Sequence, residues 1–469
     1  MTKSATKRVA YNTAIQMVGK AAIIIMGAVS VGILTRYLGP EGYGNFSLVL
    51  AYLSVFGIVA DLGLFTIAVR EISRQPARMK EIVGNTIVLR SLLSLLIFSI
   101  AIALAFVLPF NDFVKYGVLL ASISQFFGLV NTALIAIFQA RLRMDFAVLS
   151  DIVGRAAALG ATITVVAMDL GFYAIIVTAI IGSITTFLVS YLSSRRYLKL
   201  AVYADRTLWK SLLKESLPLG AAMVITQIYF KADVLMISAF RTQAEVGIYA
   251  AAFKVIEILI TIPGLFMNSI LAVLMSRMER GADYQQMLQK AFELLVILGL
   301  GFAFGGLFLA DEIMRVVGGT EFVSGADALR LLLFGVSSMM IGTLFSTVFV
   351  ANNKQLQALK YGALGLGINI VANLVLIPTI GITGAAIATV ISEAISLCLF
   401  AWFAKTRVGL TLSLGRVWKI LLAAVLMLIP TYIFRDTLWL ALPTGAAVYL
   451  GAILALRVID RDVLRELRP

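Results

Sequence analysis

The chain has 469 residues, of which 61% are hydrophobic and only 14% are charged, and its mean hydropathy is +0.98. Soluble domains contain about 45–50% apolar and about 25% charged residues, so this composition excludes a soluble globular protein and indicates a polytopic membrane protein. The formal net charge is +14, the chain has no histidine, and its single cysteine, Cys398, allows no internal disulfide.

The chain begins with a predicted helical hairpin, in which two long apolar segments flank the sequence RYLGPEGYG from Arg36. The glycines and the proline of this sequence interrupt the helical periodicity, as a tight connection at a membrane surface would. In the first segment Asn12, Gln16 and Lys20 share one helix face, and the second segment contains Asp61. Two apolar helices with polar stripes indicate a bundle around a wet interior.

Apolar runs of similar length continue to the end of the chain. A membrane-spanning helix needs about 20 predominantly apolar residues, and we count fourteen such runs. They start near Val9, Asn45, Asn85, Val114, Ala147, Gly171, Glu215, Val246, Phe292, Leu329, Leu359, Ile382, Val417 and Leu438. No signal-peptide cleavage site follows the short basic tail, so we expect the first helix to be retained.

The distribution of Lys and Arg over the connections tests this count. If the N-terminus lies in the cytoplasm, the cytoplasmic connections and both tails should be basic. They contain 28 of the 39 Lys and Arg residues, the outer connections contain 6, and 5 lie inside spans. We therefore predict fourteen spans in a cell membrane, with both termini cytoplasmic. The same bias accounts for the net charge, with attraction to anionic lipids as a secondary effect, so the charge does not indicate nucleic-acid binding.

Three short matches predict an internal repeat. The matched pairs are Gly44 with Gly247, Phe113 with Phe322 and Gly171 with Gly381, at offsets of 203, 209 and 210 residues. Matches in this order predict two six-helix lobes in the same orientation, followed by two extra helices, and such lobes place a substrate path between them. The predicted parts are an N-lobe at 1–195, a basic cytoplasmic linker at 196–214, a C-lobe at 215–405, and two extra spans with a tail at 406–469.

Four segments carry a resemblance to a known transporter family. They are RYLGPEGYGNFSLV from Arg36, ADVLMIS around Asp233, EVGIYAAAFKVIE from Glu245 and NIVANLVLIPTIGITGAAIATVISE from Asn369. Together they resemble the Wzx-type polysaccharide flippases of the multidrug/oligosaccharidyl-lipid/polysaccharide exporter superfamily. The resemblance implies a V-shaped pair of six-helix lobes around a central cavity, working by alternating access. Many members have twelve spans. With fourteen, the chain looks more like the lipid II flippases, in which two extra helices form a groove proposed to hold the lipid tail.

Ionisable residues inside the predicted spans are the strongest indication of a site. Each costs about 2.5–3.5 kcal/mol at mid-membrane and therefore needs a partner, a water-filled cavity or a task. The predicted substrate-binding residues are Lys20, Gln16, Lys231, Gln227, Lys254, Arg90 and Arg155. The residues predicted to serve charge balance or proton coupling are Asp61, Glu257 and Glu393, and Asp233 is predicted to be structural.

Structural alternatives remain open for some of these residues. Lys20 could form a structural pair with Asp61 on the neighbouring helix. Asp151 and Arg155 have the i, i+4 spacing of a plain ion pair. Arg90 could extend along its helix to the inner membrane interface.

Three classes of function compete. A flippase for a lipid-linked oligosaccharide explains cations between apolar walls, because that substrate joins anionic phosphates to a long polyprenyl tail. A cation-coupled multidrug exporter of the same superfamily would need acidic or aromatic residues to dominate its cavity. A membrane-embedded glycan polymerase has little support, because the sequence shows no histidine and no metal-ligand cluster. We therefore predict a flippase that works as a monomer without a cofactor, in contact with membrane lipids and glycan-assembly proteins, and does not bind nucleic acid.

Overall fold

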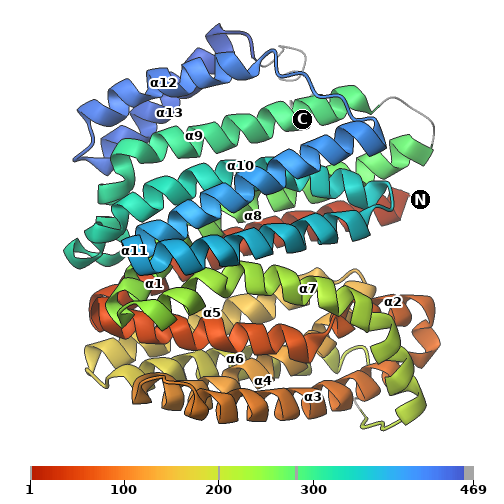
Figure 1. The fold of residues 1–469 in the computed structure, drawn as a ribbon. Helices are drawn as coiled ribbons and strands as arrows, with labels where there is room; N and C mark the ends of the chain where they lie inside the picture. The colour runs from red at the N-terminus through yellow and green to blue at the C-terminus, as the bar shows by residue number, and fades with distance from the viewer. Residues whose placement is uncertain (1–2, 199–200, 280–283, 459–469) are drawn as a thin grey trace. The chain divides into compact units, whose positions relative to one another are not determined.

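The structure is a computed structural model that describes residues 3–198, 201–279 and 284–458, with side chains from residue 15 onward except at six positions between 265 and 279. Within these ranges the regular elements are all helical, which confirms the predicted all-α class (Figure 1). The contacts divide the chain into two compact units that meet in the sequence between Ser238 and Ala239.

The first unit, here called unit 1, is a bundle of long helices in which α4 packs against α3 and α6, and α1 packs against α4 and α5. Its helices are α1 (Lys3–Asp61), α2 (Leu64–Arg74), the 3-10 turn η1 (Pro76–Arg78), α3 (Met79–Val107), α4 (Asp112–Ala140), α5 (Met144–Ala167), α6 (Phe172–Ser194) and α7 (Arg206–Phe240). An apolar cluster that includes Ile82, Leu134 and Ile137 forms one core of this unit.

The second unit, unit 2, places α10 between α9 and α11, and α12 and α13 pack together along α9 (Figure 1). Its elements are α8 (Gln243–Glu279), α9 (Gln285–Gly318), the 3-10 turn η2 (Thr320–Gly325), α10 (Ala326–Ala351), α11 (Gln355–Phe403), the π-helical turn η3 (Ala404–Val408), α12 (Val417–Ile433) and α13 (Leu438–Ala455). A large apolar cluster joins α9, α12 and α13, with Leu295, Ile420 and Ile453 at its centre.

Two helices contain a glycine break that divides them. In α1 the break is at Gly39, with φ of 64°, directly before Pro40, and in α11 it is at Gly381, with φ of 63°. The apolar segments that contain these breaks have 60 and 54 residues, and 60 helical residues would extend about 90 Å, three times the thickness of the bilayer core. Each segment therefore crosses the membrane twice.

The number of crossings agrees with the sequence. Eleven helical segments of the described chain are long and apolar enough to span a membrane. Counting the two broken segments twice gives thirteen, and α12, an apolar helix of 17 residues, brings the count to fourteen. Large apolar side chains on the outer faces, such as Leu96 of α3 and Trp439 of α13, are exposed as lipid contact requires. The chain is thus a multi-pass membrane protein.

The predicted repeat is visible in the loops before the sixth and twelfth spans. Gly171 and its match Gly381 both have positive φ, 83° and 63°, a conformation that only glycine adopts without strain. In unit 1 the hydroxyl of Tyr37 accepts a hydrogen bond from Gly171 N at 2.8 Å and donates one to Asp169 Oδ1 at 2.8 Å. In unit 2 Arg241 donates from Nε to Ile377 O at 3.0 Å. In each case the turn is held by a side chain from the end of the corresponding span: Tyr37 lies just before the break in α1, and Arg241 directly follows α7.

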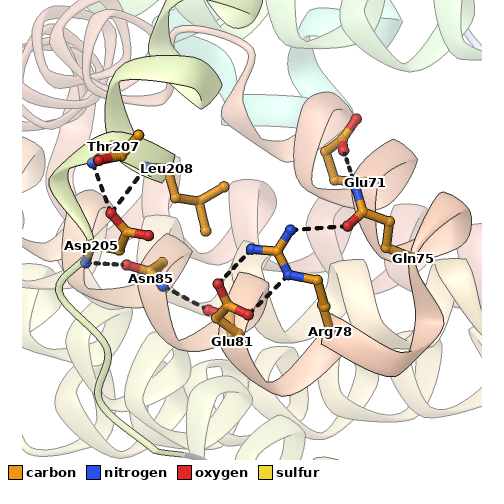
Figure 2. Close-up of polar contacts among 8 residues, drawn as sticks. All are labelled: Glu71, Gln75, Arg78, Glu81, Asn85, Asp205, Thr207 and Leu208. Carbon is orange, nitrogen blue, oxygen red and sulfur yellow. Dashed lines mark hydrogen bonds and ion pairs between the residues drawn. The ribbon is translucent and has the colours of Figure 1, made fainter.

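The predicted linker at 196–214 is partly helical, because α7 begins at Arg206. Figure 2 shows how this start is held: Asp205 Oδ1 accepts from Thr207 N at 2.8 Å, and Asp205 N donates to Asn85 Oδ1 of α3 at 2.7 Å. Asn85 in turn donates to the carbonyl of Glu81, whose carboxylate pairs with Arg78. The first turns of α7 thus pack on α3 within unit 1, and the contact boundary lies in the last turn of α7, between Ser238 and Ala239.

Candidate functional site

The most deeply buried charged group of the described chain is Arg90 on α3, whose side chain is 1% exposed. Its Nη2 lies 2.5 Å from Asp61 Oδ1, and its Nη1 donates to Leu129 O at 2.9 Å and to the hydroxyl of Thr132. The other Asp61 oxygen accepts from Gly63 N at 3.1 Å, where the backbone leaves α1. The pair therefore joins α1, α3 and α4 at the point where one helix ends.

This geometry distinguishes between the alternatives left open by the sequence. Arg90 does not extend to the interface, and the oxygens of Asp61 accept from Arg90 and Gly63 rather than from Lys20. In the described conformation the guanidinium is enclosed by protein, so a substrate has no access to it. Its predicted role in substrate binding stays a prediction, and so does the role of Asp61 in charge balance or proton coupling, of which the ion pair with Arg90 fits charge balance.

Lys20 and Gln16 lie on a part of α1 that remains accessible. Lys20 is exposed and Gln16 is half-buried, and among the described residues neither has a hydrogen bond or ion pair. The adjacent Gly19 is buried where a Cβ would overlap Val148, so α1 approaches α5 closely on that side. The side chain of Asn12, the third member of the predicted stripe, lies outside the described side chains. Lys20 is thus an exposed cation in an apolar span.

The remaining predicted residues are half-buried or exposed. Arg155 Nε lies 3.1 Å from Asp151 Oδ1 on α5, and Lys254 Nζ lies 2.7 Å from Glu257 Oε2 on α8. Both pairs keep part of their surface accessible, so each cation can still bind an anion. On α7 Gln227 and Lys231 are half-buried while Asp233 is buried, and in unit 2 Glu393 on α11 is half-buried. Lys231, Asp233 and Glu393 each have an interaction partner.

A cavity in unit 2 adds a feature that the sequence analysis did not locate. It has a volume of about 380 Å³ and lies between α9 and the α12–α13 pair, with α8 and α10 at its edges. Its walls are almost wholly apolar. The lining residues are Val255, Leu259, Ile297, Leu298, Gly301, Phe302, Gly305, Gly306, Leu309, Ile313, Leu333, Met427, Thr431, Ala441, Leu442, Gly445, Ala446, Tyr449 and Leu450.

Small residues open this cavity on both sides. Gly301 and Gly305 are one helical turn apart on α9, and Gly445 faces the same space from α13. A Cβ at Gly301 would lie 2.9 Å from the ring of Tyr449, whose hydroxyl donates to Ile297 O at 2.7 Å. The spacing of small residues at i and i+4 was the available sequence signal, but the same spacing is common where helices simply pack closely.

Two family models each match more than half of the chain. The model described as "Polysaccharide biosynthesis protein" matches residues 9–281, and the model described as "Lipid II flippase MurJ" matches residues 158–456. The probable low-salt glycan biosynthesis flippase Agl15 of Haloferax volcanii is 25% identical over 406 residues, which cover 84% of this chain and 82% of the relative.

Solved structures share the fold. A lipid II flippase MurJ in an inward closed conformation matches with a TM-score of 0.79 at 18% identity, over 96% of this chain and 99% of its own. A multidrug resistance MATE family transporter of the MOP superfamily, in an inward-facing conformation, matches with a TM-score of 0.66 at 17% identity, over 82% of this chain and 94% of its own. The match to the first structure extends over nearly the whole chain.

Proposed function

The chain belongs to the polysaccharide biosynthesis protein family, and from this premise we propose that it is a flippase which moves a lipid-linked oligosaccharide across the membrane. The substrate class is a glycan joined through phosphate or pyrophosphate to a polyprenyl tail. The direction proposed is from the inner to the outer leaflet, by alternating access between two lobes. The protein is a transporter and not an enzyme.

The observation that carries this proposal is the apolar cavity beside α12 and α13. A polyprenyl tail is a long, flexible hydrocarbon, and a ligand of that kind needs a concave, apolar wall of protein. The cavity runs along α9 from Ile297 to Ile313, which is about 24 Å of helix. The family model named for a lipid II flippase and the relative named as a glycan biosynthesis flippase support a substrate that joins a lipid to a glycan.

Four cations in the spans, two exposed and two half-buried, suit the other end of the substrate. We propose that Lys20, Lys231, Lys254 and Arg155 bind the phosphates and that Gln16 and Gln227 bind sugar hydroxyls. For Lys20, which has no described partner, an anionic phosphate in the span provides a counterion at low desolvation cost, because an unpaired ammonium there is costly. Asp61 and Glu257 then serve charge balance, as their pairs with Arg90 and Lys254 support.

A cation-coupled multidrug exporter is the second candidate. It is supported by the shared fold of the MATE family transporter. Such an exporter binds organic cations, for which an exposed Lys20 without a described acidic partner is unfavourable. We therefore retain the flippase as the proposed function.

The remaining parts of the proposal concern setting. We propose a plasma or inner membrane location with both termini cytoplasmic, because basic residues concentrate in the tails and in the connections on that side. We also propose that the protein acts as a monomer and receives its substrate from glycan-assembly proteins in the same membrane.

The experiment that tests the proposal is flipping by purified protein in vesicles, with a lipid-linked oligosaccharide as substrate and a membrane-impermeant lectin as the detector. Lys20→Gln should lower the flipping rate about 10- to 100-fold, because a charge-assisted hydrogen bond contributes about 1.5–3 kcal/mol. Folded protein should remain at the wild-type level, because the described residues show no structural partner for Lys20.

The matched control is Lys115→Gln, which neutralises a lysine in the first turn of α4, 4.0 Å from Asp112 and away from the predicted stripes. It should leave flipping unchanged. If the wild-type protein moves organic cations but not the lipid-linked glycan, the exporter is correct. If Lys20→Gln loses folded protein instead of transport, the role proposed for Lys20 is wrong.

A further inference from the structure

The pair α12–α13 is attached to α9 by polar contacts at one end. Arg416, directly before α12, places Nη1 3.1 Å from Glu293 Oε2 and donates to Val458 O at 3.2 Å. Gln289 Nε2 donates to Glu293 Oε1 at 2.8 Å and to Ser413 O at 3.0 Å. Ser413 N in turn donates to Gln289 Oε1 at 2.9 Å. These contacts of Gln289, Glu293, Ser413, Arg416 and the Val458 carbonyl are here called the Glu293 junction.

The junction holds both helices of the pair at the same end. Arg416 directly precedes the first residue of α12, and Val458 lies three residues after the last residue of α13. Lys419, one turn into α12, adds a hydrogen bond from Nζ to Leu456 O at 3.1 Å. The start of α12 and the end of α13 are therefore fixed to each other and to the same level of α9.

Glu293 is the acceptor at the centre of these contacts, and it is nearly enclosed. Its side chain is 11% exposed, and its neighbours Phe292 and Leu295 belong to the apolar core of unit 2. A carboxylate in such surroundings is stabilised by a cation and by hydrogen-bond donors, and Arg416 and Gln289 supply them. Arg416 is 39% exposed and can be solvated when the ion pair breaks, so the loss of the pair destabilises the charged form of Glu293 more than that of Arg416.

The apolar cavity begins directly beyond the junction. Its first α9 residue, Ile297, follows Glu293 by one helical turn, and its carbonyl accepts from the Tyr449 hydroxyl of α13 at 2.7 Å. At the far end, α9 and α12 meet through the rings of Phe308 and Tyr432, 5.2 Å apart in an edge-to-face contact. The two helices that wall the cavity are thus held by directional bonds at one end and by a ring contact at the other.

We propose that Glu293 is a positioning residue for the tail site: through Arg416 it holds the α12–α13 pair against α9 and so sets the width of the apolar cavity. The inference rests on the proposed function, because it assigns the cavity to an isoprenoid tail. Glu293 itself does not contact that tail, since the cavity lining begins one turn away. Without the ion pair, the junction end of α12–α13 is no longer fixed to α9, and the width of the cavity is no longer defined.

The test measures the position of the helix pair and the occupancy of the cavity separately. Spin labels at Lys290 of α9 and Leu454 of α13, both exposed, report the distance between the two helices at the junction end, in full-length protein with Cys398→Ser. A photoreactive isoprenoid alcohol is the probe for the cavity. Glu293→Gln should broaden the distance distribution and lower photolabelling several-fold, while Arg416→Lys should retain most of both.

The matched control lies on the same helix. Glu312→Gln breaks the i, i+3 pair with Arg315 near the other end of α9 and should change neither measurement. If Glu293→Gln fails to fold, Arg416→Gln breaks the same contact from its exposed side and should give the same broadening.

Three further outcomes have fixed meanings. Exchange of the two charges, Glu293→Arg with Arg416→Glu, should narrow the distance distribution again. Distances and labelling in Glu293→Gln that match those of Glu312→Gln would overturn the positioning role alone. Absence of photolabelling in the unmodified protein would overturn the tail site itself, and the role of Glu293 with it.

Discussion

Each unit contains an ion pair with a buried acid, and the two pairs differ in what they join. Asp61 and Arg90 in unit 1 are both enclosed, and they connect helices inside one bundle. Glu293 in unit 2 is enclosed, but Arg416 is partly exposed and connects the bundle to an added pair of helices. The comparison shows that a charged side chain inside a membrane protein can be neutralised by a structural ion pair and is then not available to a substrate.

The physical reason differs between the two places. Near Asp61 the backbone leaves the helix at Leu62 and Gly63, which have φ of 44° and 77°, and the Gly63 N–H is satisfied by the Asp61 carboxylate. In a membrane every backbone donor needs a partner, so the free N–H at the helix break requires the Asp61 carboxylate. The buried carboxylate in turn requires the positive charge of Arg90. At Glu293 no helix is broken, and the pair instead fixes a boundary between two packed elements.

The largest effect is expected when the enclosed pair of unit 1 is broken. Asp61→Asn leaves the Arg90 charge without its counterion, and loss of one partner of a buried pair typically costs about 3–5 kcal/mol. We expect most of the folded protein to be lost, as measured by thermal unfolding in detergent. The double variant Asp61→Asn with Arg90→Gln should recover part of the stability, because no uncompensated charge remains. A single variant as stable as the wild type would show that the pair is dispensable.

An intermediate effect is expected at the two matched turns. Arg241→Gln in unit 2 removes charge-assisted bonds to Ile377 O and Pro378 O, which contribute about 1.5–3 kcal/mol. Tyr37→Phe in unit 1 removes one charge-assisted bond, to the Asp169 carboxylate, and one neutral bond, from Gly171 N, which contributes only about 0.5–1.5 kcal/mol. Hydrogen exchange at residues 169–171 and 377–381 should therefore rise more in the Arg241 variant. The opposite order would contradict the ranking of the bonds that hold the two turns.

The smallest effect on stability is expected at the accessible pairs. Arg155→Gln on α5 and Lys254→Gln on α8 each break a partly exposed pair, and such pairs contribute about 0–1 kcal/mol. Unfolding temperatures should hardly change, whereas flipping should fall if these cations bind phosphate as proposed. Unchanged flipping in both variants would remove them from the proposed binding set.

Local features of the fold were readable from the sequence because they depend on local rules. The break at Gly39 follows from glycine next to proline, and the repeat that matched Gly171 with Gly381 correctly paired two turns with positive φ. The candidate site was harder to predict from the sequence. Arg90 and Lys20 are both basic residues in apolar spans, yet Arg90 is buried in an ion pair with Asp61, whereas Lys20 is exposed. Their difference depends on which helices pack together, and periodicity along one helix does not contain that information.

The sequence by itself determined the class of the protein, the number of spans and the family, because hydrophobic length, charge bias and short motifs are properties of the chain alone. Only the tertiary structure decided which charged side chains form structural ion pairs, and where a cavity can hold an apolar ligand. Asp61 meets Arg90 across 29 residues, and Glu293 meets Arg416 across 123. The cavity beside Gly305 exists because α9 and α13, well apart in the chain, bring small residues to the same level. Such partnerships arise from packing between helices, which no single stretch of sequence specifies.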